Sequence, residues 1–496
     1  MLEDVEWSRK QFCGAELGDV RRVRRVARLA AQMLSRPGTS IPQLCETAYE
    51  VKASYNLFSH SRSTPENLQA GHRELVREAL RAPGPEVRLL VEDTTTMSWS
   101  AEYPIPGLAP IGEKNALSQG FLAHTVLALT WASEDASEDA SEGASQGAQS
   151  RHPPLSLLGI ADQQFVLREP VPESEKALPP GSRAFRRTER AERESRLWLE
   201  STRHLGAAPE GVRWVRICDR GADIYEFLES ATEAGHGFVV RAAQNRALME
   251  EEEGDEEGGH LFERVRAEAP IASLTIHLRS RAGRAARDAE LSVSASSVVI
   301  RSPRRPGASP GKLAPIHCTA IRAWEEHPPE GEKPLEWILL TDAGVTSSAA
   351  VECVLQYATR WVIEEFHQVL KTGLGAERLQ LEHADRLFAA IAIMSVVAIR
   401  VLDLRERART VPDAPAERAG LDPLALDLLR RRTRRRLETV REVALAVGRL
   451  GGHMNRKRDG MPGWKTLWLG LKELDAMVLG ARLALQGKKR GKERFG

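Results

Sequence analysis

The sequence predicts an α/β protein whose mixed core is interrupted by a β-rich subdomain and flanked by helical regions at both ends. Three observations support this class. Apolar runs alternate with helical segments between residues 76 and 236, short β-rich runs follow, and helical periodicity marks both termini. Strands interleaved with helices are typical of an α/β core. At 496 residues the chain is also too long for one hydrophobic core, so we expect several domains.

Composition shifts predict the segment boundaries. We expect a helical domain at 1–75, the first part of the core at 76–236, the β-rich insertion at 237–345, the last part of the core at 346–408 and a helical domain at 409–496. A SEDA repeat at residues 133–150 has almost nothing to bury and predicts a disordered loop.

Short apolar runs predict the strands of the core and of the insertion. The core runs are residues 87–96, 121–131, 154–168 and 212–219, and those of the insertion are 237–243, 272–279, 291–301 and 335–342. Two core strands are expected to end in an acid, Asp93 and Asp219. Such strand ends are where α/β sheets present functional groups.

The charge is balanced overall but unevenly distributed. The net charge of +1 predicts no polyanionic partner by itself. However, basic runs at 20–28, 430–436 and 488–494 favour a nucleic-acid partner, while residues 250–257 are acidic.

Several other classes of protein are not supported. The five cysteines are scattered without a CxxC pair, which fits a reducing cytoplasm rather than a disulfide or zinc framework. The amino terminus has no signal-peptide pattern, and the apolar run at 387–399 suits a buried core helix instead of a membrane span. No Walker or GxGxxG motif is present, so we expect no nucleotide cofactor.

Residues 357–371, YATRWVIEEFHQVLK, predict one amphipathic helix. At about 100° per residue its polar residues fall opposite its apolar ones. The polar stripe is formed by Tyr357, Arg360, Glu364 and Lys371. Two interpretations stay open from this window: a solvated face with ordinary salt bridges, or a metal-binding carboxylate among cations that bind phosphate. Glu364 is the candidate carboxylate, because Glu365 lies between the two faces.

Two strand-end aspartates and a helical glutamate can hold two divalent ions about 4 Å apart. Mg²⁺ is expected, with Mn²⁺ as a substitute, because carboxylates are hard oxygen ligands. Each acid alone could instead cap a helix or lie in a loop. His124, His367 and His453 have no second ligand at a useful spacing, so we expect packing or surface roles for them.

Three blocks of sequence together resemble the catalytic blocks of bacterial DDE transposases of the IS-four insertion-sequence group, of the type found in transposon Tn five. The blocks are 92-EDTTTMSW-99, 217-ICDRGADIYEFL-228 and 356-QYATRWVIEEFHQVLKTGLGAER-378. The group's Y-x2-R-x3-E-x6-K signature is met without a gap, and its glutamate falls on Glu364. Residues 7–29 and 52–60 resemble the family's end-recognition helices, and 445–464 and 467–474 its dimerisation region.

The resemblance implies an RNase H-like core, an amino-terminal domain that binds DNA ends and a carboxy-terminal dimerisation domain. It also implies cut-and-paste transposition by nicking, hairpin formation, hairpin opening and strand transfer, with two Mg²⁺ ions per active site. The expected partners are double-stranded DNA, namely transposon inverted-repeat ends and target DNA, and a second copy of the chain. No membrane partner is expected, and the expected location is the bacterial cytoplasm.

The resemblance also implies roles for individual residues. Asp93, Asp219 and Glu364 would be catalytic and would bind metal. Trp337 would stack a flipped base, although it could be a core residue of the β-rich region. The other expected DNA contacts are Arg21, Arg22, Arg24, Arg25, Arg220, Arg241, Tyr357, Arg360, Trp361 and Lys371. Arg220, Tyr357, Arg360 and Lys371 could instead form local contacts, Trp361 could simply pack, and the amino-terminal arginines could be a solvated basic face.

Two alternative functions remain. The chain could be an inactive or domesticated DNA-binding relative or inhibitor, or an RNase H-like nuclease without strand transfer. One departure from the family pattern concerns DNA affinity, because Arg241 is followed by Ala242, Ala243 and Gln244 instead of a more basic segment.

Overall fold

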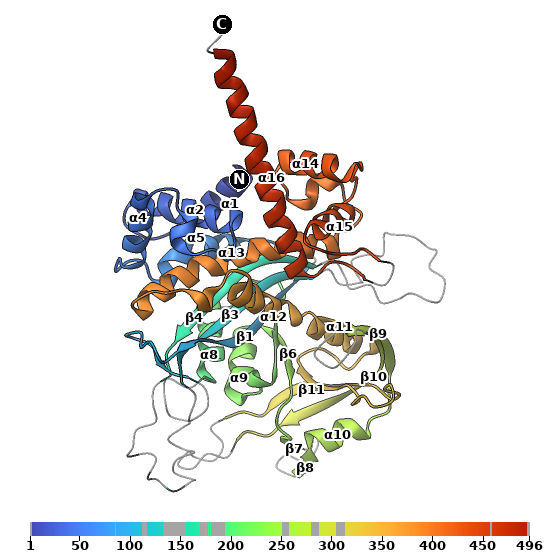
Figure 1. Ribbon diagram of the computed structural model, residues 1–496. Helices are drawn as coiled ribbons and strands as arrows, with labels where there is room; N and C mark the ends of the chain where they lie inside the picture. Colours follow the sequence, from blue (N-terminus) through green and yellow to red (C-terminus); the bar gives the residue numbers. More distant parts are fainter. Residues whose placement is uncertain are drawn as a thin grey trace.

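A computed structural model gives the structure of this chain (Figure 1). It describes residues 2–84, 86–111, 117–131, 155–168, 194–249, 257–278, 287–303, 313–456 and 459–493, with residues 174, 177 and 179 described singly. The SEDA repeat and nearly all of the acidic run lie outside the described residues.

Twelve strands within the described residues form one mixed sheet. Their order is β2-β3-β1-β5-β6-β12-β11-β10-β7-β8, with β4 paired to β3 and β9 to β10. The core strands are β1 (Val87–Ser100), β2 (Ala109–Pro110), β3 (Ser118–Trp131), β4 (Leu155–Val166), β5 (Trp214–Cys218) and β6 (Gly237–Arg241). β1, β3 and β4 pair antiparallel, whereas β5 joins β1 in parallel and β6 joins β5 in parallel. The four predicted core strands are therefore confirmed as β1, β3, β4 and β5. The run at 237–243, expected in the insertion, instead pairs with β5 as core strand β6.

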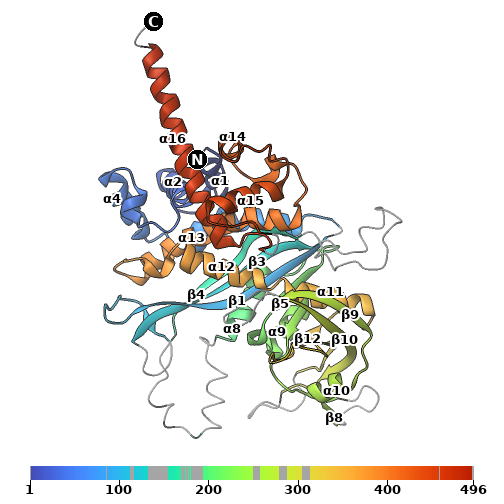
Figure 2. The same cartoon turned by 45° about the vertical axis from the view of Figure 1, so that its right-hand side comes forward.

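Helices cover both faces of this sheet. α5 (Pro65–Arg81) and α13 (Ala384–Thr410) pack on β4 from one side, and α8 (Arg196–Leu205) and α9 (Tyr225–Glu233) lie on the other (Figure 2). This double coverage explains why β3 is apolar and buried along nearly its whole length instead of alternating.

The inserted strands extend the core sheet instead of forming a sheet of their own. They are β7 (Ala247–Met249), β8 (Glu257–His260), β9 (Ala272–Leu278), β10 (Arg287–Ile300), β11 (Ile316–Trp324) and β12 (Glu336–Thr341). β12 pairs antiparallel with core strand β6. The insertion is β-rich, as expected, and also contains one helix, α10 (Leu261–Ala267), which packs on β10 and β11 through the buried side chains of Leu261 and Val265.

Short helices with side-chain caps make up the amino-terminal part. They are α1 (Leu2–Phe12), α2 (Val20–Ser35), α3 (Ile41–Leu44), α4 (Ala48–Phe58) and the already mentioned α5. Asp19, Thr47 and Thr64 accept backbone N–H bonds at the starts of α2, α4 and α5. α5 runs across residue 75, where the first boundary was expected.

The carboxy-terminal part is also helical, as predicted. α11 (Ser347–Ala358) and α12 (Trp361–Gln368) lead into α13, which is followed by α14 (Pro423–Thr433), α15 (Val440–Leu450) and α16 (Trp464–Glu493). α16 packs on α14 and α15 and then extends away from the body of the protein (Figure 1). α13 runs across the boundary expected at residue 408.

Among the described residues, one helix is long and apolar enough to cross a membrane, Ala384–Arg409. Its apolar window is 83% buried inside the protein, against α2, α4, α5 and β4. It is therefore a core helix, as the run at 387–399 predicts.

Candidate active site

The sheet register brings Asp93 and Asp219 to the same place. β1 and β5 pair in parallel up to Glu92 opposite Cys218, and each of these residues is followed by an aspartate. Adjacent parallel strands lie about 4.8 Å apart, so the two carboxylates leave the sheet as neighbours. One detail of the prediction is wrong: Asp93 does not end its strand, because β1 continues beside β3 as far as Ser100.

Glu364 reaches this edge from α12, which packs on β1. The expected single helix over 357–371 is wrong. α11 ends at Ala358, and the Thr359 hydroxyl bonds back to the Gln356 carbonyl at 2.6 Å, an interaction that bends helices. α12 then passes into a π-helical turn, η3 (Val369–Gly373), a distortion frequent at functional sites.

A single guanidinium joins two of the three acids. Arg360 donates to Asp93 Oδ2 at 3.1 Å and to Glu364 Oε1 at 3.0 Å. Even so, the pKa of Asp93 rises to about 6, first because the group is buried and then because Asp219 and Glu364 repel its charge. The three acids therefore carry more negative charge than Arg360 neutralises.

The uncompensated negative charge of the three acids favours a divalent cation at the site. The ligand atoms of Asp93, Glu364 and His367 lie within 4.8 Å of one another, which is a separation that one ion can bridge. Carboxylate oxygens are the donors that Mg²⁺ and Mn²⁺ prefer. The residues present therefore fit a divalent metal. His367 is buried, which agrees with the expected packing role, and it follows Glu364 by three residues on the same helix.

The opposite face of β1 holds a buried ionic network that the sequence did not reveal. Glu92 accepts hydrogen bonds from Arg216 at 2.5 and 2.6 Å, from Ser201 at 2.9 Å and from the Cys218 thiol at 3.1 Å. All four side chains are fully buried. Because Arg216 and Cys218 lie on β5, the network ties together the two strands that carry the aspartates.

The remaining signature residues gather around the acids. The Lys371 ammonium donates to the Thr96 carbonyl of β1 and lies 3.8 Å from Glu377. Tyr357 is buried, and its ring meets that of Trp337 edge to face with 5.0 Å between centroids. Burial raises the pKa of Tyr357, so its hydroxyl is protonated at neutral pH.

The other residues expected to contact DNA differ in the exposure and hydrogen bonding of their side chains. Arg220 is exposed, and no carboxylate partner is found for it among the described residues. Arg241 bonds the Glu336 carbonyl at 3.2 Å. Trp361 begins α12 and is half-buried.

The amino-terminal arginines divide into two kinds. Arg21 and Arg24 are exposed on α2, although Arg21 forms an ion pair with Asp19 at 2.9 Å. Arg22 bonds a backbone carbonyl, and Nη1 of Arg25 is buried without a hydrogen-bond partner in the described part of the chain. The exposed pair is better placed for phosphate contacts than the other two.

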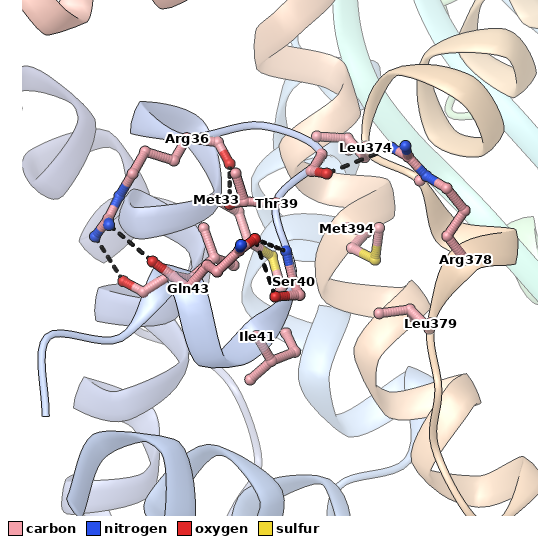
Figure 3. Close-up of a pocket in the computed structure, with 13 residues that line it drawn as sticks. Met33, Arg36, Thr39, Ser40, Ile41, Gln43, Leu374, Arg378, Leu379 and Met394 are labelled. Carbon is pink, nitrogen blue, oxygen red and sulfur yellow. Dashed lines mark hydrogen bonds between the residues drawn. The ribbon is translucent and has the colours of Figure 1, made fainter. Parts of the chain in front are cut away.

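A separate cavity of about 270 Å³ lies between the amino-terminal helices and the segment that follows η3 (Figure 3). It is lined by Arg36 and Met33 on one side and by Leu374, Arg378 and Met394 on the other. Arg378 bonds the Gly38 carbonyl across it at 3.4 Å. None of the three acids lines this cavity, so the acidic site is a distinct feature.

Family comparisons agree at both ends of the chain. Residues 4–63 match the family described as Transposase DNA-binding, and residues 396–491 match the Transposase Tn5 dimerisation domain. These matches support a Tn5-like transposase. The match to the DNA-binding family lies on α1–α4, and the match to the dimerisation family runs from α13 to α16.

The two matched families imply DNA-cutting activity and suggest a divalent metal requirement. Asp93, Asp219 and Glu364 all lie between the two matched segments, among residues 64–395 that neither family covers. Their roles must therefore be argued from geometry.

Proposed function

We propose that this chain catalyses cut-and-paste DNA transposition, with Asp93, Asp219 and Glu364 as its catalytic and metal-binding residues. The observation that carries the proposal is the position of Asp93 and Asp219 side by side on paired strands β1 and β5, with the Glu364 carboxylate within 4.8 Å of that of Asp93. The charges of Asp219 and Glu364 both raise the pKa of Asp93. When bound, divalent ions would activate a water or a 3′-hydroxyl and stabilise the leaving oxygen of a phosphodiester. Mg²⁺ is the expected ion, with Mn²⁺ as a substitute and two ions per site.

The residues around the acids would hold the DNA strand in line for attack. Arg360 forms two charge-assisted bonds to the acids and can exchange one of them for a phosphate oxygen. Lys371 is held beside β1 by its bond to the Thr96 carbonyl and adds a second cation to the site. The half-buried ring of Trp337, which contacts the buried ring of Tyr357 edge to face, is the aromatic surface on which an unpaired base can stack.

We also propose a fold for the core and a role for each region of the chain. The antiparallel strands β4, β3 and β1, continued by parallel strands β5 and β6, support an RNase H-like core. We assign end binding, core, insertion and dimerisation to the expected ranges 1–75, 76–236 with 346–408, 237–345 and 409–496, except that β6 belongs to the core and that α5 and α13 run across two of these bounds. The dimer would bridge two inverted-repeat ends and bring them to target DNA in the bacterial cytoplasm.

Cleavage of a transposon end tests the proposal. Inverted repeats that flank the gene would be labelled and incubated with the full chain and Mg²⁺ or Mn²⁺, and the products resolved on a denaturing gel. We expect a metal-dependent nick followed by a hairpin in the wild type, and neither product with Glu364→Ala. Binding without cleavage in either metal would contradict catalysis and favour an inactive DNA-binding relative.

The base-stacking role has its own test. Stacking on an aromatic residue contributes about 1–3 kcal/mol per base. Trp337→Ala should therefore leave the first nick near normal but reduce hairpin formation by roughly ten- to a hundredfold, whereas Trp337→Phe should retain most of it. Equal hairpin yields from Trp337→Ala and the wild type would rule out this role.

A further inference from the structure

We propose that Nε2 of His367 is a nitrogen ligand to the divalent ion held by Asp93 and Glu364. This inference rests on the proposed function, because it concerns the same site. It adds a donor of a different chemical kind to a set that otherwise consists of carboxylates. His367 would be a direct metal ligand, and the site would distinguish between divalent ions.

The first support is geometric. His367 follows Glu364 by three residues on α12, so the two side chains project from the same side of the helix. Asp93 approaches from β1, which packs against α12. The ligand atoms of the three residues lie within 4.8 Å of one another. One ion at the centre of such a group can contact all three donors at about 2–2.3 Å.

The second support is an unsatisfied polar atom. His367 is 5% exposed, and its Nε2 has no hydrogen-bond partner among the described residues. Leaving a buried polar group unpaired costs about 1–3 kcal/mol, so such groups call for an explanation. A packing role against Phe366, whose ring centroid lies 5.8 Å away, accounts for the burial but not for the unpaired nitrogen.

The third support is the chemistry of the donor. A neutral imidazole binds metal through a nitrogen lone pair and is a softer ligand than a carboxylate. This ligand should therefore raise the affinity of the site for Mn²⁺ relative to that for Mg²⁺.

His124 is the matched control because it is the other buried imidazole near the acids. Its Nδ1 lies 2.8 Å from the Thr94 hydroxyl, and its Nε2 lies 3.4 Å from Glu92 on the opposite face of β1. A nitrogen signal that belongs to the metal site should depend on His367 and not on His124.

The test is pulsed electron paramagnetic resonance of Mn²⁺ bound to the full-length chain without DNA. We expect ¹⁴N modulation from a coordinated imidazole in the wild type, and its replacement by ¹⁵N modulation when histidine is isotopically labelled, which needs no variant. His367→Gln should remove the modulation and weaken Mn²⁺ binding by about ten- to a hundredfold. His124→Gln should retain both.

Bound Mn²⁺ without nitrogen modulation in the wild type, or modulation that survives in His367→Gln, would overturn the inference. If either result accompanied Glu364-dependent cleavage, the proposed function would stand and only the histidine ligand would fail. Absence of cleavage in every metal would instead contradict the proposed function itself.

Discussion

Glu92 and Asp93 are adjacent on β1, yet they lie in opposite electrostatic environments. Burial opposes ionisation of both groups. For Glu92, Arg216 and the contact with His124 overcome this effect and lower the pKa to about 2. In the case of Asp93, the charges of Asp219 and Glu364 add to the effect of burial. The pKa of Asp93 therefore rises to about 6 despite Arg360.

The difference in pKa between Glu92 and Asp93 indicates a separate role for each face of β1. On the Glu92 face the Glu92 carboxylate is paired with the buried Arg216 guanidinium, which suits a structural tie between β1 and β5. On the Asp93 face the negative charge exceeds what the chain neutralises, which suits a site that receives a cation. Perturbed pKa values of this second kind are typical of functional sites.

The largest expected effect is on catalysis. Asp93→Asn keeps the shape of the side chain but removes its charge and a metal ligand. Because metal contributes several kcal/mol to the transition state, cleavage of a labelled transposon end should fall by about a thousandfold or more. DNA affinity, measured by gel shift, should stay within a few-fold of the wild type. Cleavage at near wild-type rates would show that the Asp93 face is not the active site.

The next effect is on folding and concerns the Glu92 face. Glu92→Ala leaves the buried Arg216 charge without its carboxylate, which should lower the free energy of unfolding by about 3–5 kcal/mol. Urea unfolding followed by circular dichroism measures this loss. The double variant Glu92→Leu with Arg216→Met should recover much of it. An unchanged unfolding midpoint for Glu92→Ala would mean that the network does not tie the strands.

A pH dependence of opposite sign separates the two faces. The raised pKa of Asp93 adds a contribution to the stability of the metal-free protein that is fully present below about pH 4 and is lost as the pH rises through about 6. Its size is at most about 3 kcal/mol, given a shift of roughly two units. Asp93→Asn should therefore be more stable than the wild type at pH 8 without metal, and the gain should shrink towards pH 4.

The Glu92 contribution behaves in the opposite way. Since its pKa is lowered, its stabilisation is present above pH 4.5 and is lost as the pH falls towards 2. Thermal unfolding from pH 3 to 8 measures both trends. A stability difference between Asp93→Asn and the wild type that does not vary with pH would contradict the assignment of excess charge to that face.

The smallest effect contrasts Glu364 with its neighbour Glu365. Glu365 is buried and forms an ion pair with Arg405 of α13 instead of facing the acids. Glu365→Gln should lower the free energy of unfolding by about 1–2 kcal/mol, because a hydrogen-bond acceptor remains and Arg405 also lies 3.4 Å from Glu406. Cleavage per folded molecule should stay near that of the wild type. A loss comparable to that of Glu364→Ala would show that the wrong glutamate was chosen.

The sequence predicted the parts of this fold that depend on local patterns. The core strands, the helical termini and the two aspartates after Glu92 and Cys218 all follow from apolar periodicity and its interruptions. The merging of the insertion with the core sheet could not be predicted, because the pairing of β6 with β12 joins residues about a hundred positions apart.

The sequence predicted which acids form the candidate site, but only part of their spatial arrangement. The bend after Ala358 depends on one hydroxyl that bonds back to a carbonyl, and intrinsic propensities do not indicate it. The sequence does not indicate that His367 lies beside Asp93, because Asp93 reaches it from a distant strand. Arg216 gave no signal, since a buried charge is recognised only when its partner is known.

The central claim is that the Asp93 face holds the catalytic metal, and anomalous X-ray scattering from crystals of the wild-type protein in Mn²⁺ tests it most directly. The account predicts anomalous peaks about 2–2.3 Å from carboxylate oxygens of Asp93, Asp219 and Glu364. The same crystals of Asp93→Asn should show weakened or absent peaks there. Mn²⁺ bound elsewhere in the wild type, with no peak between these three acids, would contradict the account.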